Sequence, residues 1–494
     1  MAAEILRPLS INEVTDWADT ADVVIIGYGC AGAAAALTAH EQGASVILLE
    51  MLSGGGGSSA MSGGEMYLGG GTPTQRACGF DDTPEAMAEY LIGALGPNAP
   101  EDKIRLYAQD SLEHYDWLTG YGVPFKPSFY DEPSWVPPTD DGLMWLGENA
   151  APFSSITPMA PRGHRVQSDG FGGKVLMQHL MAAVEATEVR VQNDSRAVRL
   201  ILDGDRVAGV VVRSFGENRA IRANKGVIIT TGGFIDNPRM VEQHAPQMIG
   251  VGTNSDGNDN GSGILLGQSV GAGVRRMSAG QIGIAFVPAF MTRGIVVNWQ
   301  GQRIINEDVY PGRVGQTALY EHDLEVWVIL DEQAFEEVSD DLSWGARPHH
   351  VAETVEELEE LCGFPAGSLR DTIAFYNEHA ARGEDPLFGK SARWLRPLTA
   401  PFGAMNVRNS FAESPEKARN DQAGPKGSAA GVFTIGGLHT TVDGEVCDLV
   451  GEPIPGLYAA GRASSGLHGW GYVSGTSLGD GTYFGRRAGR AAAG

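Results

Sequence analysis

The chain has 494 residues, too many for one hydrophobic core, and its apolar fraction of 42% supplies ample material for two or three globular domains. With 61 acidic against 36 basic residues the net charge is −25, which argues against binding of nucleic acid or anionic lipid and, more weakly, against a dicarboxylate substrate. Glycine is the unusual component: 68 residues occur in clusters, as nucleotide-binding folds require for tight turns and close backbone approaches.

Cysteine usage and the N-terminal sequence indicate a cytoplasmic protein. Cys30, Cys78, Cys362 and Cys447 lie far apart and form no CxxC pair, so neither a zinc ribbon nor a disulfide scaffold is predicted, and no other metal site is expected. The first residues carry acidic side chains and lack the apolar segment of a signal peptide. No run approaches about 18 consecutive apolar residues, so we predict no membrane span.

The first predicted elements form a dinucleotide-binding unit. Residues 22–27 and 45–50 have the apolar pattern of buried strands, and a small-residue helix lies between them. Glu50 ends the second strand, where a carboxylate can accept hydrogen bonds from a ribose hydroxyl. In this context a glycine turn brings the backbone and the start of the helix close to a pyrophosphate. The turn is a GxGxxG motif, Gly27-Tyr28-Gly29-Cys30-Ala31-Gly32.

The rest of the chain predicts a two-domain α/β protein. The expected elements are, in order, helices over 82–120, a long irregular segment over 123–170, a helix over 175–186, strands over 189–234, mixed strands and helices over 275–430, a strand over 453–461 and a helix over 483–494. We therefore predict a Rossmann-like nucleotide domain formed by residues 1–275 and 429–494, with an α+β substrate domain inserted over residues 276–428.

A second glycine- and serine-rich loop over residues 54–64 distinguishes this chain from NAD-binding domains, which have no evident need for it. The loop resembles the one that runs beside FAD in the succinate dehydrogenase/fumarate reductase flavoprotein superfamily. Val198, the segment 230–234 and the segment 455–461 are further matches in the same order, so the resemblance covers nearly the whole chain. Members with covalent flavin carry a histidine in this loop; here none occurs between His40 and His114, which implies noncovalent FAD.

The resemblance implies a set of FAD-binding residues spread over the predicted nucleotide domain. Their common feature is a place in a glycine turn, at a strand end or at a helix start. They are Gly27, Gly29, Cys30, Ala31, Gly32, Glu50, Met51, Gly57, Ser58, Ser59, Ser62, Gly63, Gly64, Val198, Thr231, Gly232, Gly461, Arg462, Ser477 and Leu478.

The substrate side departs from the fumarate reductase pattern, in which cationic groups bind a dianion. Phe433 stands where those enzymes have a histidine, and Tyr472 stands where they have a substrate-binding arginine. The signature around Arg303 persists, but Pro311 occupies the position of the proton-donating arginine, with Arg313 two residues away as a possible substitute. The loss of three groups disfavours dicarboxylate chemistry.

What remains resembles the 3-ketosteroid dehydrogenases, and within them the branch that acts on the C4–C5 bond of 3-keto-5α-steroids. Its terminal motif has Tyr and Ser two positions apart, as Tyr472 and Ser474 are here, whereas Gly471 occupies the place of the tyrosine of the Δ1 branch. The resemblance implies that Tyr472 stabilises charge on the C3 oxygen, that Ser474 removes the C4 proton and that FAD N5 takes hydride from C5. We expect Tyr320 to assist Ser474, with Tyr310 as the alternative.

Several alternatives stay open at this stage. They are the Δ1 reaction, a fumarate-reductase-like activity and a flavin-binding protein without turnover. His468 is expected to be structural or near the flavin, and Trp135, Trp145 and Phe129 either line a steroid entrance or anchor the irregular segment. The expected partners are a small steroid substrate and an unidentified electron acceptor.

Overall fold

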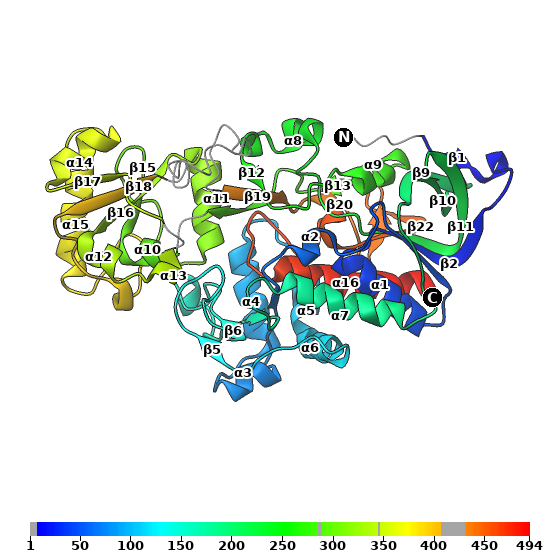
Figure 1. The fold of residues 1–494 in the computed structure, drawn as a ribbon, viewed down its shortest axis with the longest axis horizontal. Coiled ribbons are helices and arrows are strands. Elements are labelled where there is room, and N and C mark those ends of the chain that lie inside the picture. The colour runs from blue at the N-terminus through cyan, green and yellow to red at the C-terminus, as the bar shows by residue number, and fades with distance from the viewer. Residues whose placement is uncertain (1–6, 285–287, 344–345, 407–429) are drawn as a thin grey trace.

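The computed structural model describes residues 7–284, 288–343, 346–406 and 430–494, and Figure 1 shows two lobes at opposite ends of the molecule. The larger lobe is built on a sheet with parallel central strands, in which β2 (Asp19–Ile26) lies between β3 (Val46–Leu49) and β11 (Glu217–Ile229). The apolar runs of β2 and β3 are buried, as parallel strands covered on both faces require. The predicted α/β fold is therefore confirmed.

Further strands extend this sheet on both sides. They are β1 (Leu9–Ser10), β8 (Arg190–Gln192), β9 (Arg196–Asp203), β10 (Arg206–Ser214), β21 (Glu445–Cys447) and β22 (Pro453–Ala459). The order along the sheet is β1-β9-β10-β11-β2-β3-β8, and β22 joins β11 in parallel. Because β22 comes from the end of the chain, both chain ends contribute to the larger lobe.

Helices α1 (Cys30–Glu41), α7 (Gly173–Glu185) and α16 (Thr476–Ala493) lie together on one face of the sheet (Figure 1). Small residues let α1 and α16 approach closely: a Cβ added to Gly485 would lie 2.5 Å from the carbonyl oxygen of Ala31. Helix α16 begins seven residues before the helix predicted from residue 483. Its first glycines look like loop residues in the sequence, but packing on α1 keeps them helical.

The smaller lobe has its own hydrophobic core. Its antiparallel sheet has the order β15-β16-β18-β17, and Ile329 and Leu369 are fully buried beneath its helices. The elements are β15 (Ile295–Asn298), β16 (Val326–Asp331), β17 (His350–Ala352), β18 (Phe402–Asn406), α14 (Val355–Cys362) and α15 (Ser368–Ala380). This core falls within the predicted inserted domain. The boundary at residue 428 lies outside the described residues, so the domain limits stay a prediction.

Two strands and a helix connect the lobes. β14 (Gly280–Ile284) pairs antiparallel with β19 (Ala430–Thr434), which pairs with β12 (Gly252–Thr253). Helix α11 (Pro311–His322) packs directly on β14, where a Cβ on Gly315 would lie 2.7 Å from the carbonyl oxygen of Ile282. The residues just before α11 therefore lie beside the β14–β19 pair, between the two lobes.

A third group of elements lies below the larger lobe in Figure 1 and includes the predicted helical region 82–120. The irregular segment 123–170 contributes short strands to a small sheet with the order β4-β7-β6-β5. The elements are α4 (Pro84–Leu95), α5 (Glu101–Gln109), α6 (Ser111–Gly120), β4 (Glu65–Tyr67), β5 (Phe129–Tyr130), β6 (Leu143–Met144) and β7 (Gly163–Arg165). Within the described ranges no helix combines the length and apolarity needed to cross a membrane.

Candidate active site

The turn between β2 and α1 forms the base of the predicted FAD site. Gly27 has a φ of +105°, and a Cβ there would lie 2.7 Å from the carbonyl oxygen of Thr230 on the neighbouring strand. A Cβ on Gly32 would collide with the carbonyl oxygen of Gly27. Both positions therefore require glycine, and the turn presents the first N–H groups of α1 to an open edge of the sheet.

The predicted cofactor segments converge on the start of α1. The N–H of Cys30 donates to Oγ of Ser59 at 3.2 Å, which brings α2 (Gly57–Ala60) over the helix start. On the opposite side, a Cβ on Gly461 would lie 3.0 Å from the Cβ of Ala31. The first turn of α16 carries Ser477 and Leu478 and packs on the same helix.

Polar groups around this convergence fit a dinucleotide. The carboxylate of Glu50 accepts hydrogen bonds from the N–H groups of Tyr28 and Leu52, both at 2.9 Å. Burial raises the pKa of Glu50, and these hydrogen bonds act in the opposite direction. The buried Oγ1 of Thr231 has no hydrogen-bond partner among the described residues, as expected of a group that meets a ligand.

Val198 can contribute only its backbone. Its side chain is fully buried in a small core with Ile201 and Val211. The register between β9 and β10 passes from Ala197–Val212 to Arg199–Val211, so Val198 has no counterpart on β10. Such a bulge leaves the backbone of one residue unpaired, which suits the predicted role of Val198 in FAD binding.

On the substrate side, the hydroxyl of Tyr310 donates to Oγ of Ser474 at 3.1 Å. Tyr310 is buried at the start of α11, and Ser474 lies just before α16. The side-chain amide of Gln281 on β14 donates to Tyr310 at 3.4 Å and to the carbonyl oxygen of Ile282 at 3.0 Å. Burial raises the pKa of Tyr310, and so does the neighbouring Tyr472.

This arrangement corrects the prediction that Tyr320 assists Ser474. The hydroxyl of Tyr320 donates to the carbonyl oxygen of Ser278 at 3.1 Å, and its ring contacts Trp470. Ten residues of helix separate Tyr320 from Tyr310, a rise of about 15 Å along the axis. Only the start of α11 reaches the serine, so Tyr310, the alternative, is its partner.

Tyr472 lies in an aromatic setting next to this pair. Its ring meets the Phe433 ring edge-on at 5.4 Å and stacks on the His468 ring at 5.4 Å. Burial raises the pKa of Tyr472, so its phenol stays protonated as a hydrogen-bond donor. Burial lowers the pKa of His468 to about 3, and its Nε2 contacts Oγ1 of Thr476 at 3.0 Å, so His468 supports the loop as a neutral ring.

The cations near this region are already engaged. The guanidinium of Arg313 lies over the Phe153 ring at 5.3 Å and donates to the carbonyl oxygen of Ala94 at 3.4 Å. Arg462 pairs with Asp259 at 2.5 Å. Arg313 therefore does not take over the role of the arginine that Pro311 replaces, and the site suits a neutral substrate better than a dianion.

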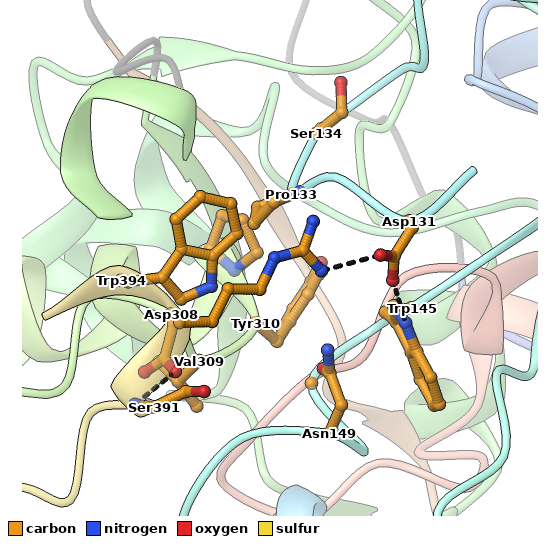
Figure 2. Close-up of a pocket in the computed structure, with 13 residues that line it drawn as sticks. Asp131, Pro133, Ser134, Trp145, Asn149, Asp308, Val309, Tyr310, Ser391 and Trp394 are labelled. Carbon is orange, nitrogen blue, oxygen red and sulfur yellow. Dashed lines mark hydrogen bonds and ion pairs between the residues drawn. The ribbon is translucent and has the colours of Figure 1, made fainter. Parts of the chain in front are cut away.

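A cavity of about 50 Å³ lies beside Tyr310, between the irregular segment and the smaller lobe (Figure 2). Its rim includes the ion pair between Asp131 and Arg393 at 2.7 Å, with Trp394 alongside. Trp145 lines the cavity and packs edge-on against Phe129 within the irregular segment, and its role at a steroid entrance stays a prediction. Ligand pockets usually enclose ~300–1,000 Å³, so this cavity is not a complete site for a polycyclic ligand.

Sequence reasoning missed two residues at this site. Gln281 contacts Tyr310, and it stands opposite Phe433 in the β14–β19 register. Glu65 begins β4 with a buried carboxyl group. Gln281 belongs to no motif; Glu65 lies in the segment 58–73, which adds to the family resemblance, but nothing in that segment assigns the glutamate a role.

Comparison with known proteins agrees with this geometry. The family model described as FAD binding domain matches residues 22–478. A crystal structure of the 3-ketosteroid-Δ4-(5α)-dehydrogenase from Rhodococcus jostii RHA1, in complex with 4-androstene-3,17-dione, matches with a TM-score of 0.93 and 45% identity. The match covers 99% of this chain and 100% of that one.

More distant relatives include both steroid dehydrogenases and fumarate reductases. The 3-oxo-5-alpha-steroid 4-dehydrogenase of Comamonas testosteroni is 28% identical over 93% of this chain and 95% of that protein. A probable fumarate reductase of Shewanella frigidimarina is 26% identical over 96% of this chain and 75% of that protein. The chain therefore belongs to the FAD binding domain family and, within it, to the 3-ketosteroid Δ4-(5α)-dehydrogenases, FAD-dependent oxidoreductases.

Proposed function

We propose that this protein introduces a double bond between C4 and C5 of 3-keto-5α-steroids and passes the electrons to an acceptor that is still unidentified. The observation that carries the proposal is the contact between Tyr310 and Ser474 next to the aromatic cluster of Tyr472, where the neighbouring arginines of the described residues are already engaged. The relative bound to 4-androstene-3,17-dione supports a steroid of this size as the substrate.

Tyr472 is the proposed donor to the C3 oxygen. Removal of a C4 proton builds enolate-like charge on that oxygen, and a phenol aimed at it stabilises the charge where it develops. The raised pKa of Tyr472 keeps its proton in place as a donor. The stacked His468 and the edge of Phe433 hold the ring in one orientation.

Ser474 is the proposed base for the C4 proton, with Tyr310 as its partner. A serine hydroxyl is a weak base alone and depends on a neighbouring group. The hydroxyl groups of Ser474 and Tyr310 are 3.1 Å apart, and hydroxyl hydrogens rotate freely, so the pair can pass a proton away from the steroid. Gln281 fixes the far side of the Tyr310 hydroxyl.

Noncovalent FAD is part of the proposal. Bound FAD would supply the acceptor for the hydride that leaves C5. The residues that would hold it are those that converge on α1, including Ser59, Thr231 and the first turn of α16. The absence of a histidine between His40 and His114 supports noncovalent attachment, and release of all flavin by acid precipitation would test it.

The proposal also includes the location of the protein in the cell and the class of its partners. A cytoplasmic location is supported by the four separated cysteines, which form no CxxC pair. The net charge of −25 supports a protein without nucleic-acid partners.

Anaerobic mixing of the purified flavoprotein with steroids tests the proposed reaction. We expect 5α-androstane-3,17-dione to bleach the visible flavin absorbance and 4-androstene-3,17-dione to leave it unchanged. Bleaching by 4-androstene-3,17-dione would move the reaction to the Δ1 position. Bleaching by neither, with reoxidation of the reduced enzyme by fumarate, would overturn the steroid assignment.

A further inference from the structure

Strand β4 places a buried glutamate beside the proposed catalytic residues. A Cβ on Gly475 would lie 2.5 Å from the N atom of Tyr67 and 3.2 Å from the carbonyl carbon of Glu65. Gly475 directly follows Ser474, so β4 packs against the loop that carries Tyr472 and Ser474. The backbone of Glu65 therefore lies against the loop that carries the proposed catalytic residues.

One oxygen of the buried Glu65 carboxyl group lacks a partner, and the carboxyl group is otherwise bonded by its own backbone N–H. The residue is 9% exposed, and its Oε1 has no hydrogen-bond partner among the residues described. A Cβ on Gly63 would lie 2.6 Å from this same oxygen, so the carboxyl group lies against the loop predicted to run beside FAD. An orphaned oxygen in this place indicates a group that interacts with a ligand.

The nearest cation attracts Glu65 without bonding to it. Arg165 stands opposite Glu65 in the β4–β7 pair. Its guanidinium donates instead to the carbonyl oxygens of Thr139 at 2.8 Å, Asp141 at 3.2 Å and Gly170 at 3.3 Å. Burial raises the pKa of Glu65, and the charge of Arg165 acts against this effect.

A negative charge on Glu65 would raise the pKa of both Tyr472 and Tyr310. After burial, Glu65 is the main cause that raises the pKa of Tyr472, and it also raises that of Tyr310. A negative charge at Glu65 would oppose the charge that develops on the C3 oxygen held by Tyr472. A neutral acid would not oppose it and would have a proton to donate.

We propose that Glu65 works as a neutral carboxylic acid that donates a hydrogen bond into the site between Tyr472 and the loop at Gly63. This role rests on the function proposed above and adds a donor to it. The charged and titratable groups that face Glu65 are Arg165 from β7, Tyr310 from the start of α11 and Tyr472 from the loop before α16. Ionisation of Glu65 at alkaline pH then slows reduction of the flavin by the steroid.

Glu65→Gln tests this role because an amide is neutral at every pH and still donates a hydrogen bond. For the wild type we expect the anaerobic flavin-reduction rate to fall about tenfold per pH unit above the pKa of Glu65. For Glu65→Gln we expect a rate close to the wild-type maximum and no alkaline decline. A flavin-loaded Glu65→Gln protein with a rate reduced by orders of magnitude at all pH values would overturn the proposal, because the carboxylate would then be required.

A second buried carboxyl group provides the matched comparison. Glu148 accepts hydrogen bonds from the Tyr67 hydroxyl at 3.1 Å and from the N–H of Leu146 at 2.6 Å, and burial raises its pKa to about 7. If Glu65 is responsible, Glu148→Gln keeps the alkaline decline that Glu65→Gln loses. The reverse pattern contradicts the proposal.

The flavin midpoint potential, measured against pH without steroid, separates this inference from the steroid assignment. We expect the wild-type curve to bend where Glu65 ionises and the Glu65→Gln curve to lack that bend. A wild-type curve without a bend contradicts the role of Glu65, even if the variant does not retain flavin. A bend in a protein that no steroid reduces rejects the proposed function, and shows only that Glu65 ionises close enough to the flavin to change its potential.

Discussion

The hydroxyl of Tyr310 lies 3.1 Å from Oγ of Ser474, although 164 positions of sequence separate the two residues. The connecting helix α11 supplies the tyrosine at its start, and the larger lobe supplies the serine just before α16. The proposed base and its partner therefore come from two distant segments of the chain that meet at the site. Any change in the packing of α11 on β14 alters the distance between the tyrosine and the serine.

Tyr310→Phe removes the proposed partner of the base. Because general-base assistance contributes roughly 10²–10⁴-fold, we expect the rate of flavin reduction by 5α-androstane-3,17-dione to fall by at least ~10²-fold. Tyr320→Phe is the matched control, since its hydroxyl bonds to the carbonyl oxygen of Ser278 outside the site. Single-turnover kinetics of the two flavin-loaded variants decide the assignment, which fails if Tyr320→Phe is the slower one.

Tyr472→Phe removes the proposed donor to the C3 oxygen but keeps the ring packed on His468 and Phe433. Loss of one donor of this kind lowers the rate by ~10²–10³-fold, and the effect falls on the transition state rather than on substrate binding. We expect a large drop in the limiting rate of bleaching and a small change in steroid affinity. The opposite pattern would mean that Tyr472 only binds the ketone.

Much of the FAD-binding half could be predicted from the sequence because its signals are local. Gly27 and Gly32 act on neighbouring backbone, and Glu50 ends the strand that follows. The choice between Tyr310 and Tyr320 could not be settled in this way. Both belong to the α11 region, and only the packing of α11 on β14 decides which end of the helix meets Ser474.

The places of other site residues could not be predicted from the sequence. Glu65 stands at the first position of a short strand, where an exposed acidic residue is the ordinary expectation. Its burial follows from contacts with Gly63 and with the backbone of Gly475, which come from distant parts of the chain. Gln281 likewise reaches Tyr310 only because β14 pairs with β19.

Because His164 is buried, we expect the unfolding free energy of the protein to fall at acid pH. Its Nδ1 lies 3.0 Å from the carbonyl oxygen of Arg162, which can only accept, so this nitrogen carries the proton and Nε2 accepts from the Thr72 hydroxyl at 2.7 Å. Burial lowers its pKa from 6.5 to about 4. The unfolded chain binds a proton at this histidine more readily than the folded protein does. The unfolding free energy therefore falls by about 3 kcal/mol as the pH falls from 6.5 to about 4.

Chemical denaturation at several pH values measures how the unfolding free energy depends on pH. We expect the unfolding free energy of the wild type to fall more steeply between these pH values than that of His164→Gln, whatever the absolute stability of the variant. Equal slopes would show that His164 does not contribute.

Gly32→Ala tests the predicted FAD turn. A Cβ at this position collides with the carbonyl oxygen of Gly27, so we expect the variant to lose FAD and to melt at a lower temperature. Gly54→Ala is the control, because a Cβ there meets no atom within 4 Å. The ratio of flavin to protein after gel filtration measures the effect, and equal ratios for the two variants contradict the assignment of the turn.

The most direct test of the proposed reaction is a single anaerobic turnover of 5α-androstane-3,17-dione deuterated at C5, with wild type and Ser474→Ala compared and the product identified. The account predicts slower bleaching with deuterium in the wild type, 4-androstene-3,17-dione as the product, and almost no bleaching in flavin-loaded Ser474→Ala. Bleaching that deuterium at C5 leaves unchanged, with a product lacking the C4–C5 double bond, would contradict it.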